Sequence, residues 1–364
     1  MLFAVLKNLF TGKFGGRPDD SGERLRIALQ AGNLPEANFL LTGMLGRMPD
    51  DAGLWRMQGE VYMRQGDNSK ALGSFSRAIT LEPKELAHHM HAAQCHKLLG
   101  DTDSAKKLCK EILCADSNFS PAHLMWANLE LPGPEYMEVL KHLHQTLTPA
   151  TYLEIGVQTG RTMALALSST QAIGVDPEPK INVMLEANAR IFDMTSDDFF
   201  AQQSINAEFG GRSIDMAFID GMHHFDFALR DFAAIERNCS RHSIVLIHDC
   251  YPLERVTAAR DRVTGFWSGD VWKAIMALKK YRPDLDINTI AAAPTGLALI
   301  RNLNPDSHVL TERMDEIVAD MNALDFDVLE KDKRGALNWF PNDWRRINEL
   351  LVPLDKRHTS LTAN

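Results

Sequence analysis

Two short segments place aspartate and histidine side chains directly after apolar runs that are typical of buried strands. The first is Asp220-Gly-Met-His223 and the second is His248-Asp249. Two carboxylates that converge with waters or substrate oxygens suit a hard divalent cation such as Mg²⁺. The imidazole of His223 can accept a proton, because an unperturbed histidine titrates near about pH 6.5. The alternative is that both carboxylates cap the helices that follow.

A second group of candidates surrounds two glycines. Gly156 and Gly160 follow a predicted strand and are expected to open a helix, and Glu154 before them offers a carboxylate for a ligand amine. Asp176 ends the next apolar run, 20 residues after Gly156, and can accept both hydroxyls of a ribose. The spacing G-x-x-x-G lacks the third glycine with which dinucleotide folds cradle a pyrophosphate. The pattern therefore favours a ligand with a ribose and an amine but no pyrophosphate, such as S-adenosylmethionine.

Weaker candidates follow later strands. Ser196 and Asp197 are placed to bind an adenine amine, and the alternative is a helix N-cap with an acidic first turn. Asp270 and Trp272 begin a predicted helix and are candidate substrate contacts, as is His248. For the tryptophan, a packing role is an equally good interpretation.

The elements that must position these side chains form an alternating pattern in the second half of the chain. Short apolar runs joined by helical segments are typical of a parallel sheet that is covered on both faces. In such sheets ligands bind beyond the carboxyl ends of the strands. The last two runs are close enough for a hairpin, so the final strand is predicted to be antiparallel. The predicted strands are 152–157, 172–175, 190–192, 216–219, 243–247, 287–292 and 296–300, with helices between them.

The first half of the chain contains an internal repeat of 34 residues. Small residues recur where two helices must approach closely, and large apolar residues recur where one helix fills the groove of the next. Glycines recur at the turns between helices. The landmarks of the middle copy are Trp55, Gly59, Tyr62, Ala71, Phe75, Ala78 and Pro83, and the turn glycines are Gly32, Gly66 and Gly100.

The middle copy, residues 52–85, resembles the tetratricopeptide repeat at every landmark, and the copies at about 18–51 and 86–119 are degenerate. Residues 120–131 are predicted to form a capping helix. The resemblance implies a surface for a peptide or protein partner. The alternatives are packing on the neighbouring domain and self-association into a homo-oligomer.

Residues from about 150 to 302 resemble class I S-adenosylmethionine-dependent methyltransferases. The similarity is to the branch with E-I-G-x-x-x-G-R-[ST], D-G-x-H-x-Y and H-D, which includes sugar and macrolide O-methyltransferases and the cephalosporin hydroxylase-like proteins. In its metal-dependent members the Asp of D-G-x-H binds Mg²⁺, the His is the proposed base, and an acidic pair ends the next strand. The matching positions here are Asp220, His223, and His248 with Asp249. His248 replaces an acidic ligand of some relatives and Phe225 replaces the Tyr, so metal dependence stays open.

The predicted fold class is an α solenoid of tetratricopeptide repeats followed by an α/β, doubly wound, mostly parallel seven-stranded Rossmann-like sheet. The predicted domains are an N-terminal extension at 1–17, three repeats plus the capping helix at 18–131, the methyltransferase domain at 132–305, a helical extension at 306–354 and a flexible tail at 355–364. Met1–Phe10 is apolar. It is interpreted as a short helix that packs on the protein, with a membrane-surface segment as the alternative.

Composition excludes several classes of function. The net charge is −9, and the whole acidic excess lies in residues 135–364, which argues against a nucleic-acid partner. The five cysteines form no C-x-x-C pair, which fits a reducing environment. The sequence has no uninterrupted apolar stretch that would predict a transmembrane helix. A cytoplasmic location is therefore expected. The leading interpretation is O-methylation of a hydroxyl-bearing small molecule or glycan, with His223 as general base. The alternatives are a repeat-based adaptor with a degenerate methyltransferase-like domain and a nicotinamide oxidoreductase.

Overall fold

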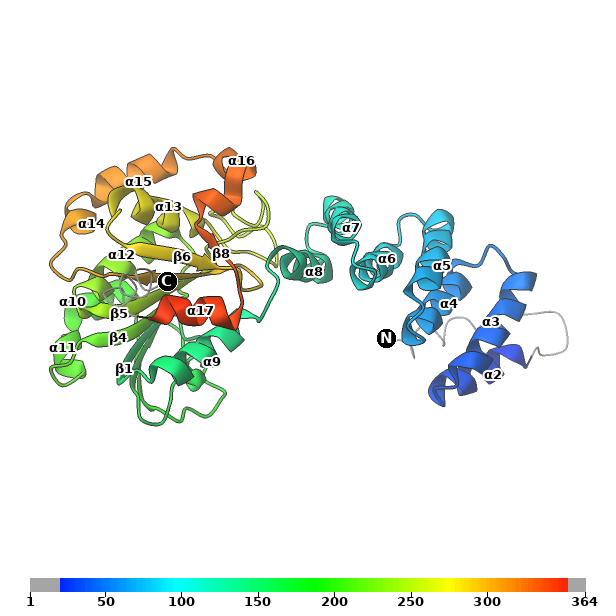
Figure 1. Cartoon of the computed structure of the whole chain (residues 1–364), viewed down its shortest axis with the longest axis horizontal. Coiled ribbons are helices and arrows are strands. Elements are labelled where there is room, and N and C mark those ends of the chain that lie inside the picture. Colours follow the sequence, from blue (N-terminus) through cyan, green and yellow to red (C-terminus); the bar gives the residue numbers. More distant parts are fainter. Residues whose placement is uncertain (1–19, 353–364) are drawn as a thin grey trace, which may run out of the picture. The chain divides into compact units, whose positions relative to one another are not determined.

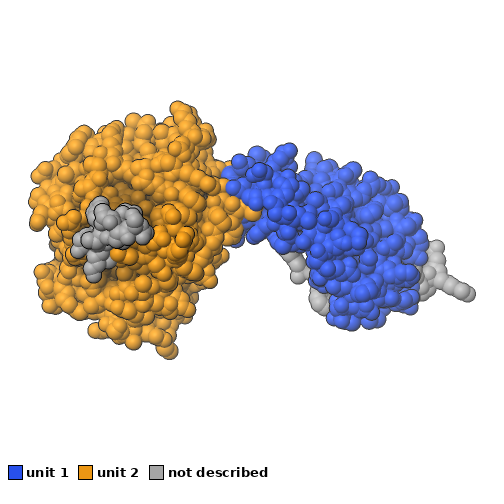
Figure 2. All heavy atoms as spheres, viewed as in Figure 1, with its two compact units in different colours: residues 1–126 blue, residues 127–364 orange. Residues whose placement is uncertain are grey.

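The computed structural model describes residues 20–352. The extension predicted at 1–17 and the tail predicted at 355–364 lie outside the described residues. The chain divides into two compact units, residues 1–126 and residues 127–364 (Figure 2). Among the helices of the described residues, none is both long and apolar enough to span a membrane.

The first unit is built from helical hairpins that follow the sequence repeat (Figure 1). Equivalent polar side chains begin the second helix of each repeat. Asn33, Asp67 and Asp101 each accept a hydrogen bond from the backbone N–H three residues later, at 3.1 to 3.3 Å. The helices are α2 (Ser21–Gln30), α3 (Leu34–Arg47), α4 (Ala52–Arg64), α5 (Asn68–Leu81), α6 (Leu86–Leu98), α7 (Thr102–Ala115) and α8 (Ser120–Glu130).

The second unit contains one mixed, mostly parallel sheet with the strand order β3-β2-β1-β4-β5-β7-β6-β8. The hairpin prediction is confirmed, because β7 pairs antiparallel with both β5 and β6. The strands are β1 (Thr151–Ile155), β2 (Gln171–Asp176), β3 (Asn188–Asp193), β4 (Ile214–Ile219), β5 (Cys239–His248), β6 (Asp286–Ile290), β7 (Leu297–Arg301) and β8 (Trp339–Phe340). The expected number of seven strands was wrong by one. The additional strand β8 has only two residues, too few to show alternation.

Helices cover both faces of this sheet. One apolar core joins one face to the helices α10 (Ser196–Gln202), α11 (Ile205–Glu208), α12 (Phe225–Glu236), α13 (Trp272–Tyr281), α14 (Val309–Glu312), α15 (Met314–Asn322) and α16 (Asp327–Ala336). A second core joins the other face to α9 (Tyr136–Leu147) and α17 (Trp344–Leu351). Figure 1 shows α9 and α17 together on one side and α12, α13 and α15 on the other. Apolar side chains at helical spacing explain both cores.

The prediction of helices between all strands was wrong at two connections. Between β1 and β2 the chain forms only the 3₁₀ turn η1 (Met163–Leu165), and no helix joins β2 to β3. Gly160 therefore does not open an α-helix. The physical reason is that α9 and α17 already cover this face of the sheet, and Met163 is fully buried in their core.

Candidate functional site

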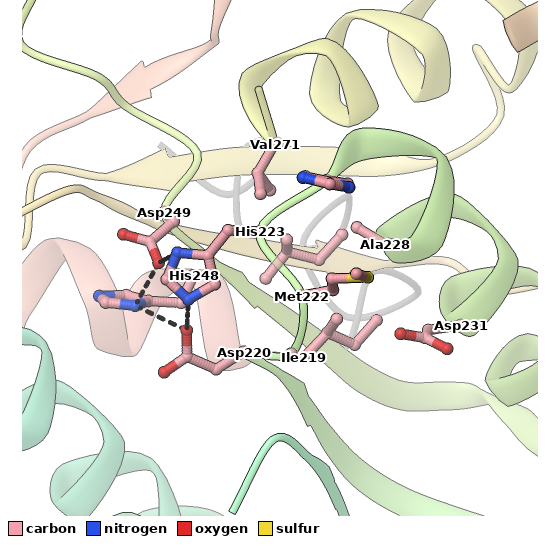
Figure 3. A pocket seen from close by; sticks show the side chains of 12 residues that line it. Ile219, Asp220, Met222, His223, Ala228, Asp231, His248, Asp249 and Val271 are labelled. Carbon is pink, nitrogen blue, oxygen red and sulfur yellow. Dashed lines mark hydrogen bonds and ion pairs between the residues drawn. The ribbon is translucent and has the colours of Figure 1, made fainter. Parts of the chain in front are cut away.

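The carboxyl ends of β4 and β5 bring together all four acidic and histidine side chains that the sequence placed after these strands (Figure 3). His248 Nδ1 lies 3.1 Å from Asp220 Oδ1 and 3.5 Å from Asp249 Oδ2. His223 Nδ1 lies 2.9 Å from Asp249 Oδ2, and its Nε2 lies 3.7 Å from Asp220 Oδ1. We call these four residues the Asp–His cluster. Because the carboxylates face the two imidazoles, the alternative that they cap helices was wrong.

The backbone of the Asp–His cluster is held in an uncommon conformation. His223 and Asp249 both have a φ of +57°, which costs a residue other than glycine about 1–2 kcal/mol. The backbone of His223 in this conformation lies directly against Gly269. A Cβ on Gly269 would lie 1.9 Å from the carbonyl oxygen of His223, so only glycine allows the two loops to meet here. Strain of this kind is common where a side chain must be aimed at a ligand.

An aromatic side chain fixes the ring of His223. Trp267 stacks on the imidazole with ring centroids 5.2 Å apart and planes 10° apart. The indole N–H of Trp267 donates to the carbonyl oxygen of Ala259 at 2.7 Å, and Arg262 lies over the indole ring. His223 is therefore held by a stacking contact and by its ion pair with Asp249.

His248 is a buried member of the Asp–His cluster. Its Nε2 lies 3.3 Å from the hydroxyl of Thr295, and its ring stacks on Tyr136 with centroids 4.1 Å apart. Its other nitrogen faces Asp220 and Asp249. Both nitrogens of His248 therefore have protein partners, and its predicted substrate contact stays a prediction.

The carboxylates control the charge of both imidazoles. Burial alone would lower the pKa of His223, but Asp249 and Asp220 outweigh burial and the pKa is raised. The same two carboxylates raise the pKa of His248 to about 10 against the effect of burial. Burial would raise the pKa of Asp249, yet His248 and His223 hold it well below its usual range. Asp249 and the two imidazoles therefore each favour the charged form of the other.

Three of these residues also have the geometry of a metal site. Asp220, His223 and Asp249 each offer one ligand atom, and these atoms lie within 4.8 Å of one another. Two carboxylates and an imidazole are a donor set that divalent cations accept. The donor set fits a cation, although His248 Nδ1 lies between the same two carboxylates.

The structure places Glu154 differently from the other predicted cofactor residues. Its side chain is fully buried in β1. The hydroxyls of Tyr152 and Thr162 each donate to its carboxylate at 2.6 Å. These two hydrogen bonds tie β1 to the following loop, and the full burial of Glu154 sets it apart from the half-buried Asp176.

Burial of Glu154 makes stability depend on pH. Burial raises the pKa of Glu154 to about 8, although the hydroxyls of Thr162 and Tyr152 lower it. Between about pH 4.5, its ordinary pKa, and pH 8 the folded chain holds a proton that the unfolded chain has released. The free energy of unfolding therefore falls as pH rises, by up to about 1.4 kcal/mol per pH unit for this group.

We predict that Glu154→Gln removes this loss of stability at high pH. Glutamine does not ionise, and its amide offers a donor and an acceptor in place of those of the neutral acid. Thermal unfolding at pH 5.5 and pH 8 measures the effect. The difference between the unfolding temperatures of the variant and the native protein should be larger at pH 8 than at pH 5.5, in favour of the variant. The exposed control Glu178→Gln should show no such difference, and equal shifts at both pH values would contradict the burial argument.

Gly156 and Asp176 shape the predicted cofactor edge. Gly156 has a φ of +88°, and a Cβ there would lie 2.1 Å from the carbonyl oxygen of Asp220. Asp176 Oδ2 accepts the backbone N–H of Gln158 at 2.7 Å and Oδ1 accepts that of Glu178 at 2.8 Å. A carboxylate oxygen accepts two hydrogen bonds, so each oxygen keeps one position for a ribose hydroxyl. The residues present fit a nucleoside at this edge.

The candidates after β3 are partly engaged by the protein. Asp197 pairs with Arg230 at 3.2 Å. Ser196 hydrogen-bonds to Asp231, whose pKa burial raises to about 7 against the effect of that bond. The N-cap of α10 is Thr195, which accepts the N–H of Asp198, so Ser196 is not the cap. Asp231 lines the pocket that contains the Asp–His cluster (Figure 3) and was not predicted from the sequence.

Two substrate candidates have structural roles. Asp270 accepts the N–H of Phe225, the first residue of α12, at 2.9 Å and pairs with Arg260 at 3.3 Å. Trp272 is 2% exposed and packs edge-on against Phe326. These contacts favour the packing interpretation, and a substrate contact by either side chain stays a prediction.

Comparison with known proteins identifies both parts of the chain. Residues 15–85 and 56–121 match the tetratricopeptide repeat family, and residues 153–250 match a methyltransferase domain family. The chain therefore carries tetratricopeptide repeats followed by a methyltransferase domain. The fold class predicted from the sequence is confirmed, apart from the eighth strand and the two missing helices.

Three individual proteins that this chain resembles are similar to its repeats. The TPR repeat-containing thioredoxin TTL4 of Arabidopsis thaliana is 32% identical over 85 residues, which are 23% of this chain and 12% of that protein. The second TPR domain of human RPAP3 in complex with an HSP70 peptide is 15% identical, covering 30% of this chain and 92% of that chain at a TM-score of 0.29. A thermophilic TPR protein of Thermus thermophilus is 22% identical, and the match covers 36% of this chain and 75% of that chain at a TM-score of 0.29.

Proposed function

We propose that this chain is an S-adenosylmethionine-dependent O-methyltransferase with His223 as its general base. The methyltransferase domain supports the transfer of a methyl group. The observation that carries the finer proposal is the position of His223, an imidazole held against Asp249 at the carboxyl edge of the sheet. The acceptor class is a hydroxyl-bearing small molecule or glycan.

S-adenosylmethionine, when bound, supplies an electrophilic methyl group on its sulfonium. The chain's own residues then have three tasks. Gly156, Gly160 and Asp176 bind the nucleoside, with Ser196 and Asp197 as weaker candidates at the adenine and Glu154 as the candidate for the amine. His223 takes the proton of the acceptor hydroxyl on the nitrogen that does not face Asp249. Asp249 stabilises the imidazolium that forms, and positioning of the two reactants supplies much of the acceleration.

The nucleoside site is tested by calorimetric titration with S-adenosylhomocysteine. We predict that Asp176→Ala lowers the affinity at least tenfold, because two hydrogen bonds to ribose hydroxyls are lost. Glu178→Ala, an exposed carboxylate two residues away, should change the affinity less than twofold. Absence of binding by the native protein would contradict the proposed function and favour the adaptor alternative.

A divalent cation, Mg²⁺, is a further part of the proposal. Asp220 and Asp249 would hold it, and it would favour the ionised form of an acceptor hydroxyl. Methyl transfer measured before and after dialysis against EDTA tests this part. We expect the rate to fall and to return with added Mg²⁺. An unchanged rate would contradict a role for the metal and would mean that His248 and His223 are sufficient to hold the two carboxylates.

The repeats are proposed to recruit a peptide or protein partner or to mediate self-association. Their match to the tetratricopeptide family supports this role. The functional parts are proposed to be 18–131 and 132–305, followed by the extension at 306–354. The five cysteines are all free, which agrees with a proposed cytoplasmic location.

A further inference from the structure

A tyrosine outside the methyltransferase-domain match lies against the Asp–His cluster. Tyr136 is the first residue of α9, whereas the match begins at residue 153. Its ring stacks on His248 with centroids 4.1 Å apart and planes 27° apart. Its backbone N–H donates to the carbonyl oxygen of Ala293 at 3.1 Å. These two contacts fix the side chain over the end of β5.

The hydroxyl of Tyr136 is available to a ligand. The side chain is half-buried, and among the hydrogen bonds of the described residues none involves this hydroxyl. Burial, with the nearby carboxylates of Asp220 and Asp249, raises the pKa of Tyr136 to about 12 against the opposing effect of Arg161. The phenol therefore remains a protonated hydrogen-bond donor at neutral pH.

The position of Tyr136 in the sheet order favours an acceptor over the cofactor. Gly156 directly follows β1, Asp176 ends β2, and Asp220 directly follows β4, and β1 lies between β2 and β4 in the sheet. Tyr136 is anchored beyond β4, on His248 at the end of β5 and on the connection between β6 and β7. The groups that anchor Tyr136 therefore lie on the β5 side of Asp220, whereas the nucleoside candidates lie on its β1 side.

We infer that Tyr136 donates a hydrogen bond to the acceptor and orients its reacting hydroxyl toward His223. The inference rests on the proposed function, and it adds a substrate-contacting residue from the helix that follows the repeats. In this role the Tyr136 hydroxyl contacts the acceptor and not the nucleoside. The competing interpretation is that Tyr136 only packs on the ring of His248.

Tyr136→Phe separates the two interpretations, because it keeps the ring and removes the hydroxyl. The probe is 4-nitrocatechol, a vicinal diol whose absorbance reports its ionisation, titrated in the presence of S-adenosylhomocysteine. We expect Tyr136→Phe to raise the Kd of the probe about fivefold to tenfold, the size of one lost hydrogen bond. Tyr136→Ala should raise it further. Tyr281→Phe makes the same chemical change at a hydroxyl bonded to Asp320 and should leave the Kd unchanged.

Three outcomes would overturn the inference. One is a Tyr136→Phe variant that binds the probe like the native protein while Tyr136→Ala is impaired, which is the signature of packing alone. Another is a native protein that binds S-adenosylhomocysteine but shows no saturable absorbance change with the probe. A third is loss of S-adenosylhomocysteine affinity in Tyr136→Phe, which would place the phenol in the nucleoside site. If the native protein does not bind S-adenosylhomocysteine, the proposed function fails as well, so the two failures are distinguished.

Discussion

Replacement of His223 by asparagine is expected to lower the rate of methyl transfer at least a hundredfold. A positioned general base contributes about 10²–10⁴ to the rate, and an amide cannot take the proton of the acceptor hydroxyl. Asparagine is chosen because it tolerates the positive φ of this residue better than most side chains. The rate is measured as S-adenosylhomocysteine formed with the best acceptor from a panel of catechols, glycosides and hydroxylated polyketides.

The control for this variant is the neighbouring histidine. The ring of His224 faces the carbonyl oxygen of Arg260 at 3.2 Å instead of the Asp–His cluster. His224→Asn should therefore keep the rate within about threefold, and both variants should bind S-adenosylhomocysteine with native affinity. Equal losses in the two variants would show that the loop, and not the imidazole of His223, limits the reaction.

Gly156→Ala is expected to disrupt the nucleoside site and to destabilise the second unit by about 3 kcal/mol or more. A left-handed φ costs alanine about 1–2 kcal/mol. The added Cβ would also lie 2.1 Å from the backbone oxygen of Asp220, so β1 and β4 must separate. Urea unfolding measures the stability, and calorimetry should show at least a tenfold loss of S-adenosylhomocysteine affinity.

Gly210→Ala is the matched control, because this glycine also has a positive φ, +63°, but has nothing within 4 Å of an added Cβ. It should show the conformational cost alone and bind S-adenosylhomocysteine like the native protein. Similar effects at both positions would mean that the contact between Gly156 and Asp220 is not what shapes the edge of the sheet.

Local patterns were sufficient to predict most of the sheet. The apolar runs after residues 150 and 213 are long enough to identify buried strands, and the hairpin between 292 and 296 follows from its spacing. The absent helix after Gly160 could not be predicted, because the run Met163–Leu167 has helical composition. Its conformation depends on α9 and α17, which pack on the same face from distant parts of the chain.

The candidate site shows the same division between local and distant information. Asp220, His223, His248 and Asp249 were predicted from their place after strands, and the topology brings them together. Tyr136 was missed because nothing in its local sequence distinguishes it from other residues of an amphipathic helix. Glu154 has the residue type of a ligand, but only the fold reveals that Tyr152 and Thr162 occupy its oxygens.

The central claim is that the carboxyl edge of β1, β2 and β4 binds a nucleoside thioether whose sulfur faces His223. A crystal structure of the chain with S-adenosylhomocysteine tests it most directly. The account predicts both ribose hydroxyls on the carboxylate of Asp176, the chain of the ligand passing Gly156, and the sulfur directed toward the imidazole of His223. A ligand bound elsewhere, or an edge filled by the protein's own side chains in the presence of saturating ligand, would contradict the account.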